Sequence, residues 1–241
     1  IHDAATAYRR GSSIKNHAIP HAGKRYLLKL DFKNFFPSLK EQALRHCLGR
    51  DTAYSEVELW MLSQLLLRRP HGSSKLCLSI GAPSSPHISN YLMYEFDVAV
   101  TQLCRSVHAN YTRYADDLAI STSIPSSLDE IQNAIRKLLT RMSYLGLKFN
   151  EEKTVNVSTK SRRTLVGLTL SNEGHVSIGR DAKRRLRAAM HSCVNGNLTA
   201  DEVMKLRGTL SFVLSVDSEF VSNLCARYGF DSIQEIGSSG Q

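Results

Sequence analysis

The chain has 241 residues, 42% of them hydrophobic, which suffices for one large domain with an appendage. No apolar run approaches the ~18 residues of a membrane span, and the five scattered cysteines form no Cys-x-x-Cys pair, which argues against membrane proteins, disulfide scaffolds and zinc sites. The formal net charge of +9 favours a polyanionic partner, with a merely basic protein as the alternative.

Apolar patterning predicts an α+β chain that ends in helices. The predicted strands are Tyr26–Leu30, Ala109–Arg113, Leu118–Thr122, Thr154–Val157 and a hairpin over Thr164–Ile178 around Asn172-Glu173-Gly174. The clearest helices cover Asn90–Leu103 and the run after Ser127 that Gly146 ends. Capping-box spacing predicts helix starts at Ser38 and Glu41, Ser55 and Glu58, Ser127 and Glu130, and Thr199 and Glu202. From about Arg180 the pattern is wholly helical, which predicts a small helical domain.

Two adjacent carboxylates, Asp116 and Asp117, stand between two predicted strands, and Asp31 ends a third. Such a group can hold two divalent cations about 3.5–4 Å apart, one activating an attacking oxygen and one stabilising a leaving oxygen. Magnesium prefers oxygen ligands of this kind, and the backbone carbonyl of Phe32 could add another. The pattern therefore favours phosphoryl transfer on nucleic acid. The alternative is that the Asp-Asp pair only makes a hairpin turn.

Basic side chains gather around the start of the predicted helical domain. Each phosphate that such a cluster neutralises releases counterions, so the cluster would hold a duplex with strong salt dependence. The alternative is a solvated helix face. The cluster comprises Lys160, Arg162, Arg163, Arg180, Lys183, Arg184, Arg185 and Arg187. Of these we expect RNA contacts from Arg162, Arg163, Arg180, Arg184 and Arg185.

Three motifs follow one another in order: Asp31-Phe32-Lys33-Asn34-Phe35-Phe36, Gly81-Ala82-Pro83-Ser84-Ser85-Pro86 and Tyr114-Ala115-Asp116-Asp117. Here the sequence resembles reverse transcriptases, whose palm motifs A, B and C have this form and order, over nearly the whole chain. The resemblance implies a right-hand polymerase: an antiparallel palm sheet backed by helices, partial fingers and a helical thumb. We expect fingers at 1–25, a palm at 26–179 with a fingers insertion around 40–80, a thumb at 180–236 and a flexible tail at 237–241.

The resemblance also implies roles for single residues. Asp31, Asp116 and Asp117 would bind two Mg²⁺ ions while the primer hydroxyl attacks a deoxynucleotide triphosphate. Phe36 stands at the sugar-gate position, where a ring would exclude a ribose 2′-OH; the alternative is a core aromatic.

The motif B and motif D stretches add two further expectations. Gly81-Ala82-Pro83 would lie along the incoming nucleotide, although the Pro-Gln that commonly precedes this glycine is Ser79-Ile80 here. Lys153 lies in a stretch that resembles motif D, where a lysine could donate a proton to the leaving pyrophosphate or stabilise its charge. A solvated surface lysine is the alternative.

Two stretches resemble the bacterial retron subgroup. Asn16, Ala18 and His21 match its Asn-x-Ala-x-x-His signature, so we expect Asn16 and His21 to contact RNA, or alternatively to brace a loop. Val166–Leu170 with Val176–Arg180, and Leu210–Asp217, are similar to the retron C-terminal region. Leu165-Val166-Gly167 departs from the Val-Thr-Gly that retrons carry there.

The five scattered cysteines suit free thiols in a reducing cytosol, so we expect a cytoplasmic protein. The retron resemblance implies an RNA-directed DNA polymerase that copies a structured noncoding RNA into single-stranded DNA. It further implies an RNA–DNA duplex, an effector protein and a role in anti-phage defence. We also expect further fingers residues before Ile1. Alternatives are a non-retron defence reverse transcriptase with different priming, and a catalytically inactive RNA-binding scaffold, against which the three retained aspartates argue.

Overall fold

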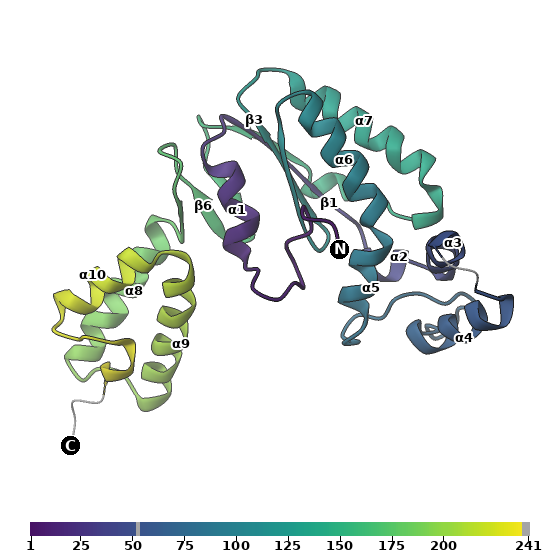
Figure 1. The fold of residues 1–241 in the computed structure, drawn as a ribbon. Coiled ribbons are helices and arrows are strands. Elements are labelled where there is room, and N and C mark those ends of the chain that lie inside the picture. The colour runs from purple at the N-terminus through teal and green to yellow at the C-terminus, as the bar shows by residue number, and fades with distance from the viewer. Residues whose placement is uncertain (52–53, 238–241) are drawn as a thin grey trace.

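An antiparallel sheet forms the centre of the molecule in the computed structural model, which describes residues 1–51 and 54–237 (Figure 1). Its strands lie in the order β2-β3-β1-β4. They are β1 (Tyr26–Asp31), β2 (Asn110–Tyr114), β3 (Asp117–Thr122) and β4 (Val155–Ser158). A tight turn joins β2 to β3, which makes the pair antiparallel. The predicted α+β class and its antiparallel sheet backed by helices are confirmed.

The two faces of this sheet follow the alternation of the strand sequences. Leu28 and Leu30 point into one core with Ile120, while Leu27 and Ala119 point into another. Helices α6 (Tyr94–Ser106) and α7 (Ser127–Arg141) cover the first face, and α1 (Ile14–Ala22) packs on the opposite face (Figure 1). The strand ends that carry Asp31 and Asp117 therefore belong to a sheet that is covered on both sides.

A smaller helical lobe follows β1. It contains α2 (Phe35–Ser38), α3 (Glu41–Asp51), α4 (Glu56–Leu66) and α5 (Ser85–Leu92). The helix that the sequence predicts over Asn90–Leu103 is two helices, because α5 ends at Leu92 and α6 begins at Tyr94.

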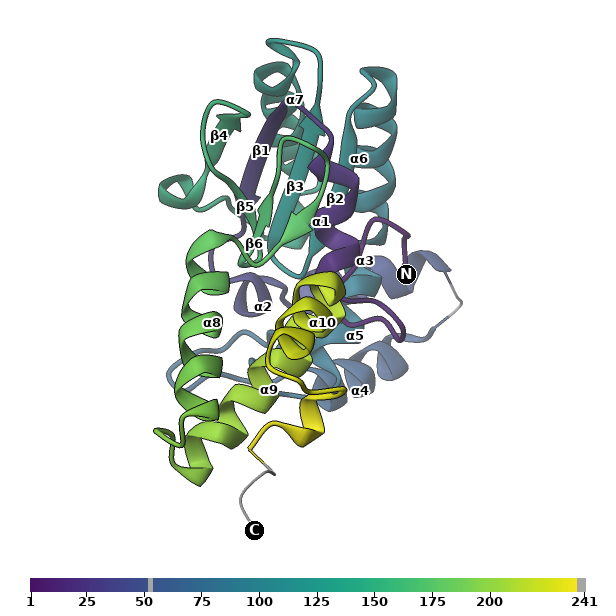
Figure 2. The ribbon, with the colours of Figure 1, turned by 90° about the vertical axis from the view of Figure 1, so that its left-hand side faces the viewer.

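The C-terminal third begins with a second sheet in the order β5-β6-β7. Its strands are β5 (Arg163–Leu165), β6 (Leu168–Leu170) and β7 (Val176–Ser177). The predicted single hairpin is thus two hairpins, because Val166 and Gly167, both with positive φ, make an additional turn. Helices α8 (Arg180–Val194), α9 (Ala200–Val216) and α10 (Ser218–Arg227) follow, and α8 runs directly from this sheet (Figure 2).

Two of the predicted capping boxes form and two do not. Ser55 with Glu58 and Thr199 with Glu202 close reciprocal hydrogen bonds at the starts of α4 and α9. Ser38 instead ends α2. The Ser127 hydroxyl donates to the carbonyl of Ile124, so it does not cap α7.

Short 3₁₀ helices complete the structure: η1 (Ser143–Leu145), η2 (Glu151–Lys153) and η3 (Ile233–Glu235). Gly146, predicted to end the helix after Ser127, has φ +68° and follows η1, since α7 itself ends at Arg141. Apart from Gly237, the predicted flexible tail lies outside the described residues.

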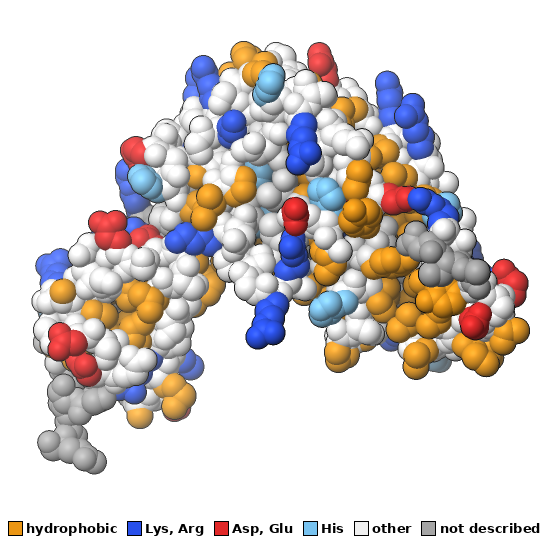
Figure 3. Space-filling model, in the orientation of Figure 1, with side chains coloured by type: hydrophobic (Ala, Val, Ile, Leu, Met, Phe, Trp, Pro, Cys, Tyr) orange, Lys and Arg blue, Asp and Glu red, His pale blue; other side chains and the backbone are white. Residues whose placement is uncertain are grey.

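The molecule has the shape of an arch. The surface is hollowed between the lobe of α8–α10 and the lobe that carries α3 and α4, with the central sheet above the hollow (Figures 1 and 3). Over the part of the chain that the structure describes, no helix combines the length and apolarity that a membrane crossing requires.

Candidate active site

Strand pairing brings the three predicted aspartates together. In the β1–β3 register Asp31 lies opposite Asp117. The amide of Phe32 donates to the carbonyl of Asp116 at 3.1 Å, which ties the β2–β3 turn to the end of β1. Residues 85 positions apart in sequence therefore share one edge of the sheet, as a carboxylate centre requires.

The environment of these carboxylates disfavours their negative charge. Burial, followed by repulsion from Asp116 and Asp31, raises the pKa of Asp117 to about 6. Burial and then the charge of Asp31 also raise the pKa of Asp116. A nearby cation would relieve both effects.

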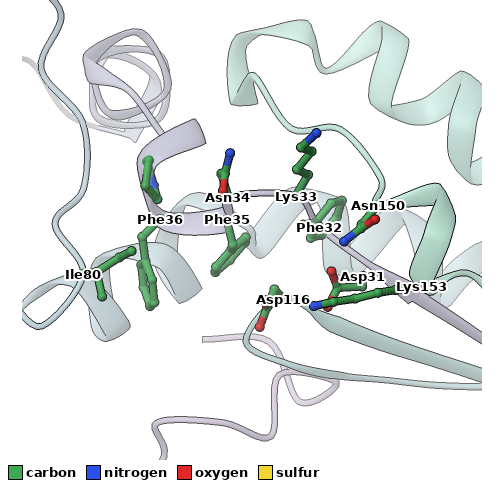
Figure 4. Close-up of a pocket in the computed structure, with 11 residues that line it drawn as sticks. Asp31, Phe32, Lys33, Asn34, Phe35, Phe36, Ile80, Asp116, Asn150 and Lys153 are labelled. Atoms are coloured by element: carbon green, nitrogen blue, oxygen red, sulfur yellow. The ribbon is translucent and has the colours of Figure 1, made fainter. Parts of the chain in front are cut away.

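Lys153 already supplies one positive charge. Its Nζ lies 3.1 Å from Oδ2 of Asp31, and the hydrogen bond with Asp31 raises the pKa of Lys153 (Figure 4). Asp31 is nearly buried, whereas the Lys153 side chain is 62% exposed. The lysine thus reaches into the carboxylate group from solvent.

Across the described residues, no set of three or more histidine, cysteine, aspartate or glutamate side chains lies in an arrangement that could hold a metal ion. Asp31 contacts the Lys153 ammonium instead. The donor chemistry nevertheless suits a hard divalent cation, because the three converging groups offer carboxylate oxygens and their raised pKa values reflect mutual repulsion.

A cavity of about 420 Å³ extends from the carboxylates to the Phe36 ring, which is predicted to contact the sugar (Figure 4). Asp31, Asp116 and Lys153 lie at one end, and Phe36 and Ile80 lie at the other. Its lining residues are Asp31, Phe32, Lys33, Asn34, Phe35, Phe36, Pro37, Ile80, Asp116, Asn150 and Lys153. One space therefore joins the predicted metal ligands to the predicted nucleotide-contacting ring.

The predicted motif B residues lie just outside this lining. Ile80 is 74% exposed and faces the cavity, while Gly81 has φ +84°, a conformation that glycine adopts without strain. Ala82 and Pro83 continue the loop towards α5. Phe32 packs against the Phe149 ring at 5.1 Å, so its side chain supports the cavity floor.

A buried network behind the β2–β3 turn was not expected from the sequence. The Arg113 side chain pairs with Asp97 of α6, with Nη2 2.6 Å from Oδ2, and both side chains are 0% exposed. Arg113 also donates to the carbonyl of Ala115 at 3.0 Å. The available signal was a charged residue inside a strand whose other residues are uncharged.

The signature histidine is a structural brace in this fold. His21 is completely buried, and its ring nitrogens lie 2.7 Å from the hydroxyls of Ser121 and Thr112. Thr112 also contacts His17 Nδ1 at 2.8 Å. This burial leaves His21 without an atom to offer RNA, so the expected RNA contact gives way to the bracing alternative.

Asn16 remains exposed. Its side chain accepts hydrogen bonds from the amide and hydroxyl of Ser13 and thereby caps α1.

The basic cluster divides into one buried and several exposed residues. Arg163 is 1% exposed, and its guanidinium donates to the carbonyls of Lys24, Ala22 and Ser171, so the expected RNA contact is corrected to a structural role. Four of the predicted RNA-contacting residues stay exposed: Arg162, Arg180, Arg184 and Arg185.

Similarity to known proteins agrees with this arrangement. Residues 1–170 match the family model described as reverse transcriptase (RNA-dependent DNA polymerase). The chain is 34% identical to the Retron Ec83 reverse transcriptase of Escherichia coli, over 98% of this chain and 77% of that protein. It is 33% identical to the Retron Ec86 reverse transcriptase of the same organism, over 92% of this chain and 68% of that protein.

Among solved structures, an apo telomerase from Candida tropicalis is similar with a TM-score of 0.49 and 15% identity. The similarity covers 84% of this chain and 43% of the telomerase chain.

Proposed function

Because the chain belongs to the reverse transcriptase family and is a retron-type RNA-directed DNA polymerase, we propose that Asp31, Asp116 and Asp117 form its catalytic centre. The retron relatives favour this assignment over a non-retron defence reverse transcriptase, and the aspartate substitutions below distinguish it from an inactive RNA-binding scaffold. The observation that carries the proposal is the strand register that sets Asp31 opposite Asp117 and beside the Asp116 turn.

Divalent metal ions are generally used in this family. In our proposal the three aspartates hold two Mg²⁺ ions, with the Phe32 carbonyl as a further ligand. When bound, the ions would activate the primer hydroxyl and stabilise the leaving pyrophosphate. The protein's contribution is to hold the carboxylates, and hence the reacting groups, in position.

The cavity suggests how the remaining residues act on a deoxynucleotide triphosphate. Phe36 would close the sugar end against a 2′-OH, and Ile80 with Gly81-Ala82-Pro83 would line the base and template side. Lys153 would leave Asp31 when a metal binds and protonate or stabilise the pyrophosphate. In this proposal the sugar of the nucleotide lies at the Phe36 end of the cavity, and its phosphates lie at the end that contains Lys153.

We further propose that the template is a structured noncoding RNA and that the first bond forms on an RNA 2′-OH, as the retron resemblance implies. In this assignment residues 26–179 are the palm, 180–236 the thumb, and 1–25 with about 40–80 the fingers. Exposed arginines of α8 would hold the RNA–DNA duplex, and an effector protein would act with the enzyme in anti-phage defence.

The carboxylate assignment is tested with Asp116→Asn and Asp117→Asn. Removing a ligand charge should reduce deoxynucleotide incorporation by more than about 100-fold in Mg²⁺ without unfolding the protein. The matched control is Asp201→Asn, an exposed aspartate at the start of α9, which should incorporate normally. Unchanged incorporation by Asp116→Asn would refute the assignment.

The priming assignment is tested on the nucleic acid that co-purifies with the protein. Sequencing should find one RNA joined covalently to the DNA product. A DNA product that migrates identically before and after ribonuclease digestion would contradict priming on RNA.

A further inference from the structure

The catalytic turn contains a strained residue. Ala115, between Tyr114 and Asp116, has φ +57°, a left-handed conformation that few residues other than glycine adopt. Such a conformation persists only where surrounding contacts hold it, and it occurs often at functional sites. The contact here is the Arg113 guanidinium, whose Nη1 donates to the Ala115 carbonyl at 3.0 Å.

The guanidinium is itself fixed on three sides. Its Nε and Nη2 donate to the two carboxylate oxygens of Asp97 at 2.8 and 2.6 Å. Nη2 also donates to Oδ1 of Asn90 at 3.1 Å. Arginine and aspartate are both fully buried, and a buried ion pair is a weak source of stability because desolvation offsets its attraction. The pair is better explained by the geometry that it imposes.

The Arg113 guanidinium also connects the turn, through Asn90, with the N-terminal segment. Asn90 belongs to α5, the helix after the motif B loop, and its side-chain amide donates to the Ala7 carbonyl at 3.0 Å. The next residue, Tyr8, also has positive φ, and its ring lies 6.3 Å from the ring of Phe36. The buried arginine therefore connects the turn that carries Asp116 with the segment beside the sugar-gate ring.

We propose that Arg113 is a positioning residue, which holds the Ala115 carbonyl so that the carboxylates of Asp116 and Asp117 face a divalent cation. The inference rests on the proposed catalytic role of these aspartates. Lysine cannot replace the arginine, because one ammonium lacks the planar fork that reaches Asp97 and the Ala115 carbonyl together.

The test compares Arg113→Lys with Tyr111→Phe. Tyr111 is the matched control, since its hydroxyl donates to the same Asp97 carboxylate at 2.8 Å but lies on the strand away from the turn. We would measure Mn²⁺ binding by calorimetry on the protein without nucleic acid, amide hydrogen exchange at Phe32 and in the turn, and incorporation rate against Mg²⁺ concentration.

Arg113→Lys should weaken Mn²⁺ binding and raise the half-maximal Mg²⁺ concentration by about 10-fold or more, the effect typical of a lost metal-orienting contact. It should also speed exchange of the Phe32 amide, which donates to Asp116. Tyr111→Phe should lower the unfolding temperature but leave metal binding and exchange in the turn unchanged.

Native metal binding and native exchange in a folded Arg113→Lys protein would overturn the inference. If that variant does not fold, the inference is tested with the double variant Asp97→Asn, Arg113→Gln. This variant has no unpaired buried charge and no side chain long enough to reach the turn. Native metal binding there would equally overturn it, and weakened binding would support it. Failure of the proposed catalytic role of the aspartates can be told apart from failure of this inference, because only the former would give normal incorporation by Asp116→Asn.

Discussion

Lys153 reaches Asp31 with a mostly exposed side chain. Its contribution to stability can therefore be measured separately from its contribution to the incorporation rate. An exposed ion pair contributes little stability. Lys153→Ala should therefore leave the free energy of unfolding nearly unchanged. If the lysine is the proton donor, the incorporation rate should fall by about 100-fold or more. Denaturant unfolding and single-nucleotide kinetics measure the two effects.

The control for this substitution is Lys148→Ala, an exposed lysine of the same stretch that lies outside the cavity lining. It should match the native protein in rate and stability. A Lys153→Ala enzyme as fast as this control would assign Lys153 to the surface-lysine alternative.

Phe36 is the residue at which sugar selection should be decided. Its ring stands at the far end of the cavity from the carboxylates and packs against Phe35 at 5.3 Å. Phe36→Val would remove the ring edge, so the preference for deoxynucleotides over ribonucleotides should fall by about 10- to 100-fold. A general loss of activity would lower deoxynucleotide and ribonucleotide incorporation alike, so it would not change the ratio of the two efficiencies. An unchanged ratio would favour the core-aromatic alternative.

At the scale of elements, α1 is fastened to the sheet by two buried histidines. Burial lowers the pKa of His17 from 6.5 to about 4, with the charge of Lys29 adding to the effect, and burial and then His17 lower the pKa of His21 to about 3. The unfolded chain therefore binds more protons than the folded one below about pH 6.5. Stability should fall as the pH decreases from about 6.5 towards 4.

His17→Asn tests this dependence because the amide can keep a polar contact with Thr112 but does not titrate. On acidification, the free energy of unfolding of this variant should decrease less than that of the native chain. The difference should be on the order of 3 kcal/mol for the full His17 pKa shift. Denaturant midpoints from pH 7 to 4.5 measure the difference. His71→Asn, at an exposed histidine, is the control, and equal slopes in all three proteins would contradict the explanation.

At the scale of the whole molecule, the positive charge of the helical lobe should control affinity for a duplex. Lys183 is already engaged with Asp217 at 2.7 Å and lies over the Phe220 ring, so the exposed arginines of α8 are better candidates. The triple variant of Arg180, Arg184 and Arg185 to alanine should weaken binding of an RNA–DNA hybrid. It should also reduce the salt slope by about one unit for each lost phosphate contact.

The matched control removes three exposed basic residues from the helices behind the sheet: Arg105, Lys137 and Arg141 to alanine. Both triple variants lower the net charge equally. If both variants reduce the salt dependence of hybrid binding equally, the reduction comes from net charge alone, and the duplex does not bind along α8.

The α+β class, most strands, the helical domain from about Arg180 and the order of the three motifs could be predicted from the sequence alone. These follow from apolar periodicity and local turn chemistry, which act over a few residues. The sequence also predicted that Asp31 and the Asp116-Asp117 pair belong together, because three carboxylates at the ends of neighbouring strands can hold divalent cations and because the three motifs occur in order.

Which polar residues are buried became clear only from the packing of the elements. His21 and Arg163 were expected at the RNA surface, yet packing of α1 and of the second sheet covers both. Arg113 was expected only as the end of a strand, yet α6 supplies Asp97 to neutralise it. The physical reason is that burial of a charge depends on partners distant in sequence, which no local pattern encodes.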